Sequence, residues 1–185
     1  MSRLLAVLVS AALAMPAAAQ HSEAGRFVAG MVRMMAGGDR HAMRQSVLRF
    51  ADVPGLARSA VGRHWERMSE AQRARYIDLY ETYVVTALAR QAARGEADVI
   101  FVEERVIGER QTLVGARVTP PGGRSRLVHW RVREVEGRMS IVDVLDEGVS
   151  LASVHRADLT GWLNAHNGDI EGFLTMLAER ARRGG

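Results

Sequence analysis

Four short strand-like runs joined by very short turns most strongly limit what this chain can fold into. The runs cover residues 100–102, 113–118, 127–132 and 139–145 and are rich in Val, Ile, Leu and aromatic residues. The turns between them contain Gly108-Glu109, Pro120-Pro121-Gly122-Gly123 and Glu136-Gly137. Turns of this length allow hairpins, whereas parallel strands need crossovers of a dozen or more residues. The sequence therefore predicts a four-stranded antiparallel meander.

Alternation within the second and third runs predicts a sheet with one apolar and one polar face. The apolar positions are Val114, Ala116, Val118, Val128, Trp130 and Val132. Most positions between them carry polar or charged side chains, including Arg117, His129 and Arg131. An apolar sheet face must be covered, and helices are the available cover. We therefore expect an α+β fold in which helices lie over one face of a curved sheet.

Helical patterns fill residues 22–94 and return after the last strand-like run. Gly37-Gly38 is expected to end the first helix, and Asp39 is expected to cap the next. Pro54 is well placed in the first turn of a short helix that continues to Trp65. After the last strand, Asp169 is expected to cap the final helix.

The longest predicted helix begins at a capping box, Ser69-Glu70-Ala71-Gln72. Its apolar stripe consists of Tyr76, Tyr80, Tyr83, Val84, Ala87 and Leu88. Two interpretations of this stripe stay open. The tyrosines pack in the core with each hydroxyl reaching a surface partner, or they form a cavity wall with their polar tips near the head of a ligand. On the second interpretation, Tyr80, Tyr83, Val84 and Leu88 face the apolar strands.

The first 19 residues have the pattern of an export signal. A short positive segment, Met1-Ser2-Arg3, precedes an apolar run from Leu4 to Met15, and Ala17-Ala18-Ala19 forms a small-residue cleavage site. A transmembrane anchor needs about 20 apolar residues, which this run lacks. The alternative is a buried N-terminal helix. We expect a signal peptide at residues 1–19 and a single domain at residues 20–185 in a Gram-negative periplasm.

Composition and missing motifs argue against an enzyme. The chain has no cysteine, which excludes disulfides, thiol nucleophiles and thiolate metal sites. Nucleophile-elbow, phosphate-loop, zinc-protease and dinucleotide-binding motifs are absent, and no two histidines are spaced i, i+4. The acidic cluster of Asp143, Asp146 and Glu147 is explained by capping, turn formation and ion pairs, and His129 by a solvated or cross-strand position on the polar face of its strand. We therefore expect no catalytic residue, metal or cofactor, and the apolar sheet face indicates binding of an apolar ligand.

Charge and export together restrict the partners. Lys and Arg number 25 against 21 Asp and Glu, which gives a formal net charge of +4. Export argues against nucleic acid as the target of this basic balance, so acidic proteins or anionic lipid surfaces are better candidates.

Several short motifs occur together in an order that resembles the MlaC family of periplasmic phospholipid-binding proteins. This family is also described as the toluene-tolerance auxiliary component of an ABC transport system. The motifs are Asp52 to Ala57, Val61-Gly62-x-x-Trp65, Gln72-Arg73, Thr82-Tyr83, Ile141-x-Asp143-Val144, and Glu147 to Leu151 with Arg156 and Leu159. The sequence departs from the family pattern at His64, Met139 and His155, which affects the shape expected for the pocket.

The resemblance implies that sheet and helices enclose a deep apolar pocket that holds the acyl chains of a diacyl phospholipid. It also implies a shuttle, expected to be monomeric, that carries lipid between an outer-membrane lipoprotein complex and an inner-membrane ABC transporter complex with a substrate-binding ring, and so maintains outer-membrane lipid asymmetry. Three alternatives are a hopanoid or other lipid carrier of the same family, a non-lipid envelope adaptor, and a small periplasmic enzyme. The expected pocket residues are Tyr80, Tyr83, Val84, Leu88, Val114, Ala116, Val118, Val128, Trp130, Val132 and Val144, with Val149 and Leu151 at the pocket mouth.

Overall fold

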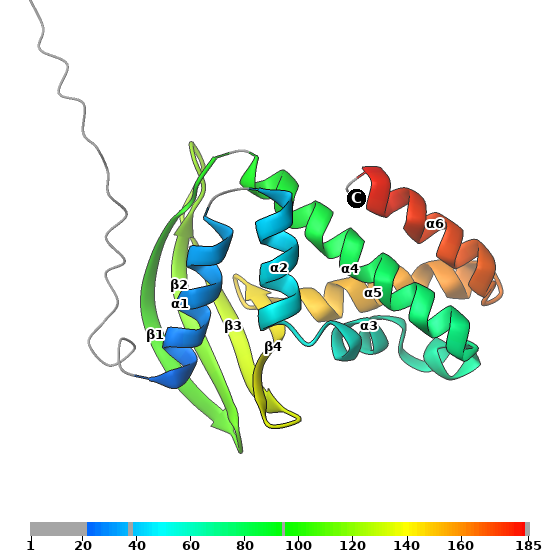
Figure 1. The fold of residues 1–185 in the computed structure, drawn as a ribbon, viewed down its shortest axis with the longest axis horizontal. Helices are drawn as coiled ribbons and strands as arrows, with labels where there is room; N and C mark the ends of the chain where they lie inside the picture. Colours follow the sequence, from blue (N-terminus) through cyan, green and yellow to red (C-terminus); the bar gives the residue numbers. More distant parts are fainter. Residues whose placement is uncertain (1–21, 37–38, 94, 184–185) are drawn as a thin grey trace, which may run out of the picture.

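The strands form one antiparallel sheet in chain order, with the helices on one side of it (Figure 1). The computed structural model describes residues 22–36, 39–93 and 95–183. The strands are β1 (Asp98–Gly108), β2 (Gln111–Thr119), β3 (Arg126–Val135), β4 (Arg138–Asp146) and β5 (Val149–Ser150). Their order in the sheet is β1-β2-β3-β4-β5. The predicted antiparallel meander and α+β class are therefore confirmed.

The sheet has five strands rather than the four expected. Glu147 and Gly148 both have positive φ, 50° and 81°, so the chain reverses within two residues after β4. This reversal pairs Val149 with Asp146, and Ser150 with Leu145. A strand of two residues is too short to show a period of two, which is why the sequence pattern missed it.

The register confirms the predicted apolar face. Val114 pairs with Trp130, Ala116 with Val128, and Trp130 in turn with Val144. Side chains at paired positions project to the same side of a sheet, so these residues share one face.

The helices are α1 (Glu23–Met35), α2 (Arg40–Phe50), α3 (Val53–Val61), the 3₁₀ helix η1 (Gly62–Arg67), α4 (Glu70–Ala92), α5 (Leu151–Ala165) and α6 (Ile170–Arg183). The predicted caps at Asp39, Ser69 and Asp169 are confirmed. Side chains of Asp39, Asp52, Ser69 and Ser150 accept hydrogen bonds from backbone N–H groups in the first turns of α2, α3, α4 and α5. Both halves of the Ser69 capping box are present.

One predicted helix is divided in two. The helix expected to run to Trp65 ends at Val61, and a 3₁₀ turn continues to Arg67. Gly62 has a φ of 51°, which α-helical backbone does not adopt, and the α-helix ends there.

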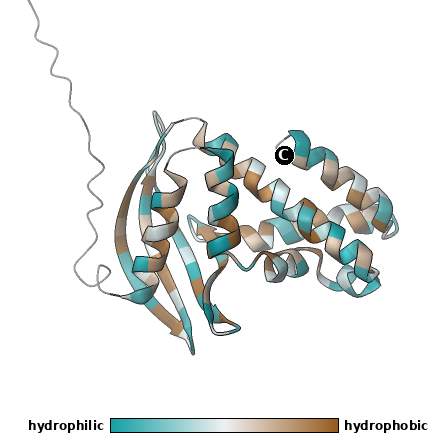
Figure 2. Cartoon of the chain, in the orientation of Figure 1, coloured by the Kyte–Doolittle hydropathy of each residue, from teal (hydrophilic) through white to brown (hydrophobic). Residues whose placement is uncertain are grey.

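Two apolar clusters form the core, and Figure 2 shows apolar residues on both the strands and the helices. The helical cluster joins buried residues of α2 to α6, including Val61, Tyr76, Leu159 and Phe173. The sheet cluster joins buried residues of α1, the end of α2 and β1 to β4. Met35, at the end of α1, packs against both clusters.

The sheet is covered by a different helix from the one expected. Val28 and Met31 of α1 belong to the sheet cluster, and Phe27 packs edge-on against Phe50 of α2 with ring centroids 4.9 Å apart. The inward side of α4 packs instead with α2, α3 and α6, and Tyr80 belongs to the helical cluster. The apolar face of α4 was suited to cover the sheet, but in this structure other helices pack against that face.

The predicted signal peptide, residues 1–19, and the predicted helix end at residues 37–38 lie outside the described residues. Within the described ranges, none of the helices combines the length and the apolar character needed to cross a membrane.

Candidate functional site

Six of the expected pocket residues are apolar side chains that the fold leaves only partly buried. Three lie on the sheet and pack against the sheet cluster, and three lie on α4 and pack against the helical cluster. They are Val118, Val128 and Val144 on the strands, and Tyr83, Val84 and Leu88 on the helix. A partly exposed apolar side chain gains free energy when a ligand removes its remaining surface from water. These six residues are therefore the part of the predicted set best suited to contact an apolar ligand.

Four other expected pocket residues are closed off by the protein itself. Val114 and Ala116 are fully buried, Val132 is 2% exposed and Trp130 is 8% exposed, all in the sheet cluster beneath α1. Phe101 of β1 packs beside Trp130, with ring centroids 6.3 Å apart. In this structure these four residues belong to the packed core of the sheet cluster.

The tyrosine stripe serves mainly as core. Tyr76 is fully buried, and its hydroxyl donates a hydrogen bond of 3.0 Å to the backbone oxygen of Ala57. Tyr80 is 2% exposed, and its hydroxyl lies 2.9 Å from Nδ1 of His155. Both hydroxyls are therefore satisfied by protein partners, as the core-packing interpretation requires, although these partners lie inside the molecule. Tyr83 is only partly buried, and its ring packs edge-on against His155.

Burial shifts the pKa values of Tyr80 and His155. Desolvation raises the pKa of Tyr80, and the neighbouring Tyr83 and Asp143 raise it further, so the hydroxyl keeps its proton. Desolvation also lowers the pKa of His155, while Asp158 and Asp143 oppose that shift. The neutral imidazole can thus accept a hydrogen bond from the Tyr80 hydroxyl at Nδ1.

The two residues expected at the pocket mouth lie on the surface. Val149 in β5 is 56% exposed and Leu151, the first residue of α5, is 39% exposed. Both follow the tight turn at Glu147-Gly148, close to the end of β4. Val149 pairs with Asp146 of β4, which places this segment beside the sheet, and a position at the pocket mouth stays a prediction.

The acidic cluster and His129 have the structural roles expected of them. Asp143 accepts backbone hydrogen bonds from Val144 and Ala152, and Asp146 forms an ion pair with Arg126. His129 on β3 lies 2.6 Å from Glu103 on β1, across the intervening strand. Across the part of the chain that the structure describes, no group of three or more His, Asp or Glu residues could hold a metal ion.

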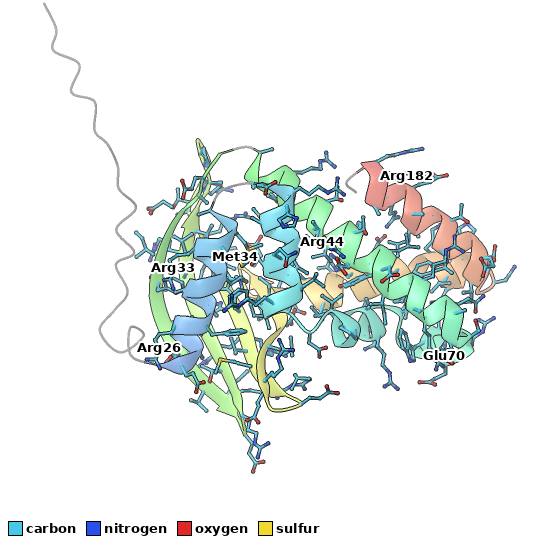
Figure 3. All side chains as sticks on the ribbon, in the orientation of Figure 1. Arg26, Arg33, Met34, Arg44, Glu70 and Arg182 are labelled. Atoms are coloured by element: carbon cyan, nitrogen blue, oxygen red, sulfur yellow. The ribbon has the colours of Figure 1, made fainter. Side chains whose placement is uncertain are left out.

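Sequence reasoning missed the contribution of α1. Its residues Val28 and Met31 cover the sheet, and Met35 touches both clusters. The helical spacing of Phe27 and Met31 showed that this helix has an apolar face, but a periodic pattern does not say which surface covers it. Figure 3 labels Met34 on α1, close to α2, together with charged residues of the same two helices, Arg26, Arg33 and Arg44.

The fold and these residues define a class of protein: an α+β domain in which an antiparallel sheet and a helical layer each carry an apolar cluster with partly buried side chains at its margin. The family model for the MlaC protein matches residues 36–179, and the chain belongs to the MlaC family. No curated protein matches the sequence. Among solved structures, the chain is similar to the phospholipid-binding protein from Ralstonia solanacearum in complex with a phospholipid. The TM-score is 0.72, the identity is 17%, and the match covers 86% of this chain and 95% of that one, a likeness that shows a shared fold.

Proposed function

We propose that this protein is a periplasmic carrier that binds one diacyl phospholipid. The observation that carries the proposal is membership of the MlaC family over residues 36–179. It is supported by the shared fold with a protein whose structure contains a phospholipid. The family and this neighbour point to binding or transport rather than to an enzyme.

The acyl chains are proposed to lie between the two apolar clusters. Val128 and Val144 would contact them from the sheet, and Val84 and Leu88 from α4. These side chains are apolar, partly buried and packed against different clusters, which supports the placement. Val114, Ala116, Val132 and Trp130 would then support the wall from behind rather than touch the lipid.

Energetics explain why a lipid needs such a carrier. Each methylene transferred from water to an apolar environment gains about 0.8 kcal/mol, so about 20 exposed methylenes would cost roughly 16 kcal/mol. Free diffusion of a phospholipid through water is therefore negligible. Transfer from a bilayer to an equally apolar pocket is close to neutral, so the carrier needs a dry cavity and direct docking more than high affinity.

Docking partners follow from the family. We propose that the protein receives lipid from, or delivers it to, an outer-membrane lipoprotein complex and an inner-membrane ABC transporter complex with a substrate-binding ring. This exchange would maintain the lipid asymmetry of the outer membrane. The predicted signal peptide at residues 1–19 is consistent with a periplasmic place of action.

Native mass spectrometry of the purified protein tests the proposal. We expect a mass increment of a diacyl phospholipid at close to one per chain, retained from the expression host or acquired from liposomes. The mass of a hopanoid or of another lipid in its place would show that the protein carries a different lipid. Protein that stays free of lipid even after incubation with liposomes would contradict the proposal and favour an adaptor that binds only proteins.

A further inference from the structure

A polar pocket of about 270 Å³ lies at the edge of the sheet, where β4 meets the N-terminus of α5. Its polar lining residues are Ser59, Arg131, Asp143, Ser150, Ser153 and Arg156. The lining comes from α3, β3, β4, β5 and α5, so elements of both the sheet and the helical layer meet here. The volume lies below the range of roughly 300–1,000 Å³ typical of small-molecule sites, so it suits a small chemical group rather than two acyl chains.

A β-bulge in β4 lies beside the pair Arg131 and Asp143, and both of these residues line the pocket. Arg131 pairs with Asp143, but the next residue of β3, Val132, pairs with Ile141, which leaves Val142 as an extra residue of β4. Bulges of this kind bend a strand and redirect its side chains. Arg131 also alternates with Trp130 and Val132, so it projects from the polar face while those residues project into the sheet cluster.

Two arginines supply positive charge that the protein does not neutralise. The Nε atom of Arg131 is buried and has no hydrogen-bond partner among the described residues. Within the same ranges, neither Arg131 nor Arg156 forms an ion pair. A buried donor without a partner is costly, which favours a ligand that accepts hydrogen bonds at this place.

Asp143 does not act as the missing partner. Its Oδ1 accepts hydrogen bonds from the backbone N–H groups of Val144 at 2.9 Å and Ala152 at 3.1 Å. The carboxylate therefore binds to the first turn of α5, where the helix dipole stabilises a negative charge. Since two arginines face one such carboxylate, the pocket keeps a net positive charge.

Arg156 is held at the pocket by a close approach to the backbone. A methyl group added at Gly62 would lie 3.2 Å from Nη2 of Arg156, so the guanidinium packs directly against the start of η1. Gly62 has a φ of 51°, and its lack of a side chain leaves room for the arginine. The guanidinium is thereby positioned between the helical layer and the sheet.

Exposed apolar side chains neighbour the lining residues along the chain. Val149, Leu151 and Val154 alternate along the chain with the lining residues Ser150 and Ser153, and they are 56%, 39% and 47% exposed. A ligand that carries both an oxyanion and apolar groups matches this combination, whereas a free inorganic anion would use only the pocket. Guanidinium groups bind phosphate oxygens through two parallel hydrogen bonds, which fits them to a phosphodiester.

We propose that this pocket binds the phosphodiester of the phospholipid headgroup, with Arg131 and Arg156 as its ligands. The proposal rests on the proposed function and adds to it a recognition site for the charged end of the lipid. Ser59 and Ser153 provide further hydrogen bonds, and the exposed valines and leucine contact the glycerol and the first methylenes.

A loading competition tests the headgroup site. Purified protein is incubated with liposomes that contain equal amounts of phosphatidylglycerol and of diacylglycerol with the same acyl chains, and native mass spectrometry measures the total lipid per chain and the ratio of the two. The wild type should prefer phosphatidylglycerol. The double variant Arg131→Gln/Arg156→Gln should load less phosphatidylglycerol relative to diacylglycerol, with the preference reduced roughly tenfold or more, because hydrogen bonds to charged groups are lost.

The control variant Arg133→Gln/Arg138→Gln removes two exposed arginines of β3 and β4 and should keep the wild-type ratio. If the double variant does not fold, the single variant Arg156→Gln is used in the same competition. This side chain is exposed, so its loss leaves the core intact. A wild-type ratio in the folded arginine variants would overturn the headgroup site while leaving phospholipid binding in place. Wild-type protein that loads neither lipid would overturn both proposals.

Titration with inorganic phosphate separates the two sources of the oxyanion. The headgroup site predicts that phosphate alone binds weakly and does not displace loaded phosphatidylglycerol. Phosphate binding that the arginine variants lose, together with an unchanged lipid ratio, would assign the pocket to a free anion and overturn the headgroup proposal.

Discussion

Ala116 and Val128 are paired residues on neighbouring strands, yet their surroundings differ. Ala116 is fully buried beneath α1, whereas Val128 keeps part of its surface exposed at the margin of the sheet cluster. A single substitution at each position therefore distinguishes structural core from a surface available to lipid.

Introducing arginine at these two positions should give different results. Ala116→Arg buries an unpaired charge and should destabilise the protein by roughly 3 kcal/mol or more. Val128→Arg should leave the fold intact, because the long side chain can reach solvent, but should strongly reduce lipid loading. Urea unfolding measures the first effect and native mass spectrometry the second. A folded Val128→Arg variant with full loading would show that the acyl chains lie elsewhere.

His155 should make stability depend on pH. Burial holds the pKa of the folded imidazole below the ordinary value of 6.5, against the opposing charges of Asp158 and Asp143. As the pH falls below 6.5, the unfolded chain takes up a proton that the folded chain resists, so the free energy of unfolding decreases until the pH passes the folded pKa. Protonation also removes the Nδ1 acceptor that faces Tyr80, while the aromatic ring of Tyr83 offers no replacement.

Thermal unfolding of the wild type and His155→Gln between about pH 5 and 8 measures this effect. The wild type should lose more stability on acidification than the variant, whose position 155 does not titrate. Parallel curves for the two proteins would show that His155 is not the group responsible.

At the scale of elements, the turn between β4 and β5 depends on one glycine. Gly148 has a φ of 81°, a conformation that side-chain-bearing residues rarely adopt, yet an added methyl group would meet no atom within 4 Å. The cost of a substitution there is therefore backbone strain rather than a clash. This turn positions Ser150 to cap α5 and brings Val149 and Leu151 beside the sheet.

Gly148→Ala should lower the free energy of unfolding by about 1 kcal/mol through strain in the left-handed region. Gly161→Ala is a matched control, because Gly161 lies within α5 with no atom near an added methyl group. This control should raise stability by roughly 0.5–1 kcal/mol, since alanine favours helix. Equal effects of the two substitutions in denaturant unfolding would contradict the role assigned to the turn.

At the scale of the whole molecule, two apolar clusters share one chain and meet through few residues. Met35 packs against both, and α2 contacts α1, α4 and β4. A ligand that contacts Val128 and Val144 from one side and Val84 and Leu88 from the other would add apolar contacts between the two clusters.

Removal of lipid should therefore lower the thermal stability of the whole domain. A ligand bound only to the folded state at 100 times its Kd contributes about 2.7 kcal/mol, which corresponds to a Tm change of roughly 5–10 °C for a domain of this size. Thermal unfolding before and after delipidation measures the difference, and Val128→Arg should show none. Identical Tm values for loaded and delipidated wild type would argue against a ligand held between the clusters.

The sequence by itself determined the local structure. The caps at Asp39, Ser69 and Ser150, the reversal at Gly148 and the alternation along β2 and β3 depend on residues within a few positions of one another, so they are readable from the order of amino acids. Membership of the MlaC family was also visible, because its motifs are short and ordered along the chain.

Only the tertiary structure decided which apolar faces meet. α1 rather than α4 covers the sheet, Val149 and Leu151 lie exposed, and Arg131 and Arg156 line one polar pocket beside the bulge at Val142. The hydrophobic effect is non-directional, so an apolar stripe specifies that it must be buried but not against what. The choice of partner depends on long-range geometry, which the pattern of residues along the chain does not contain.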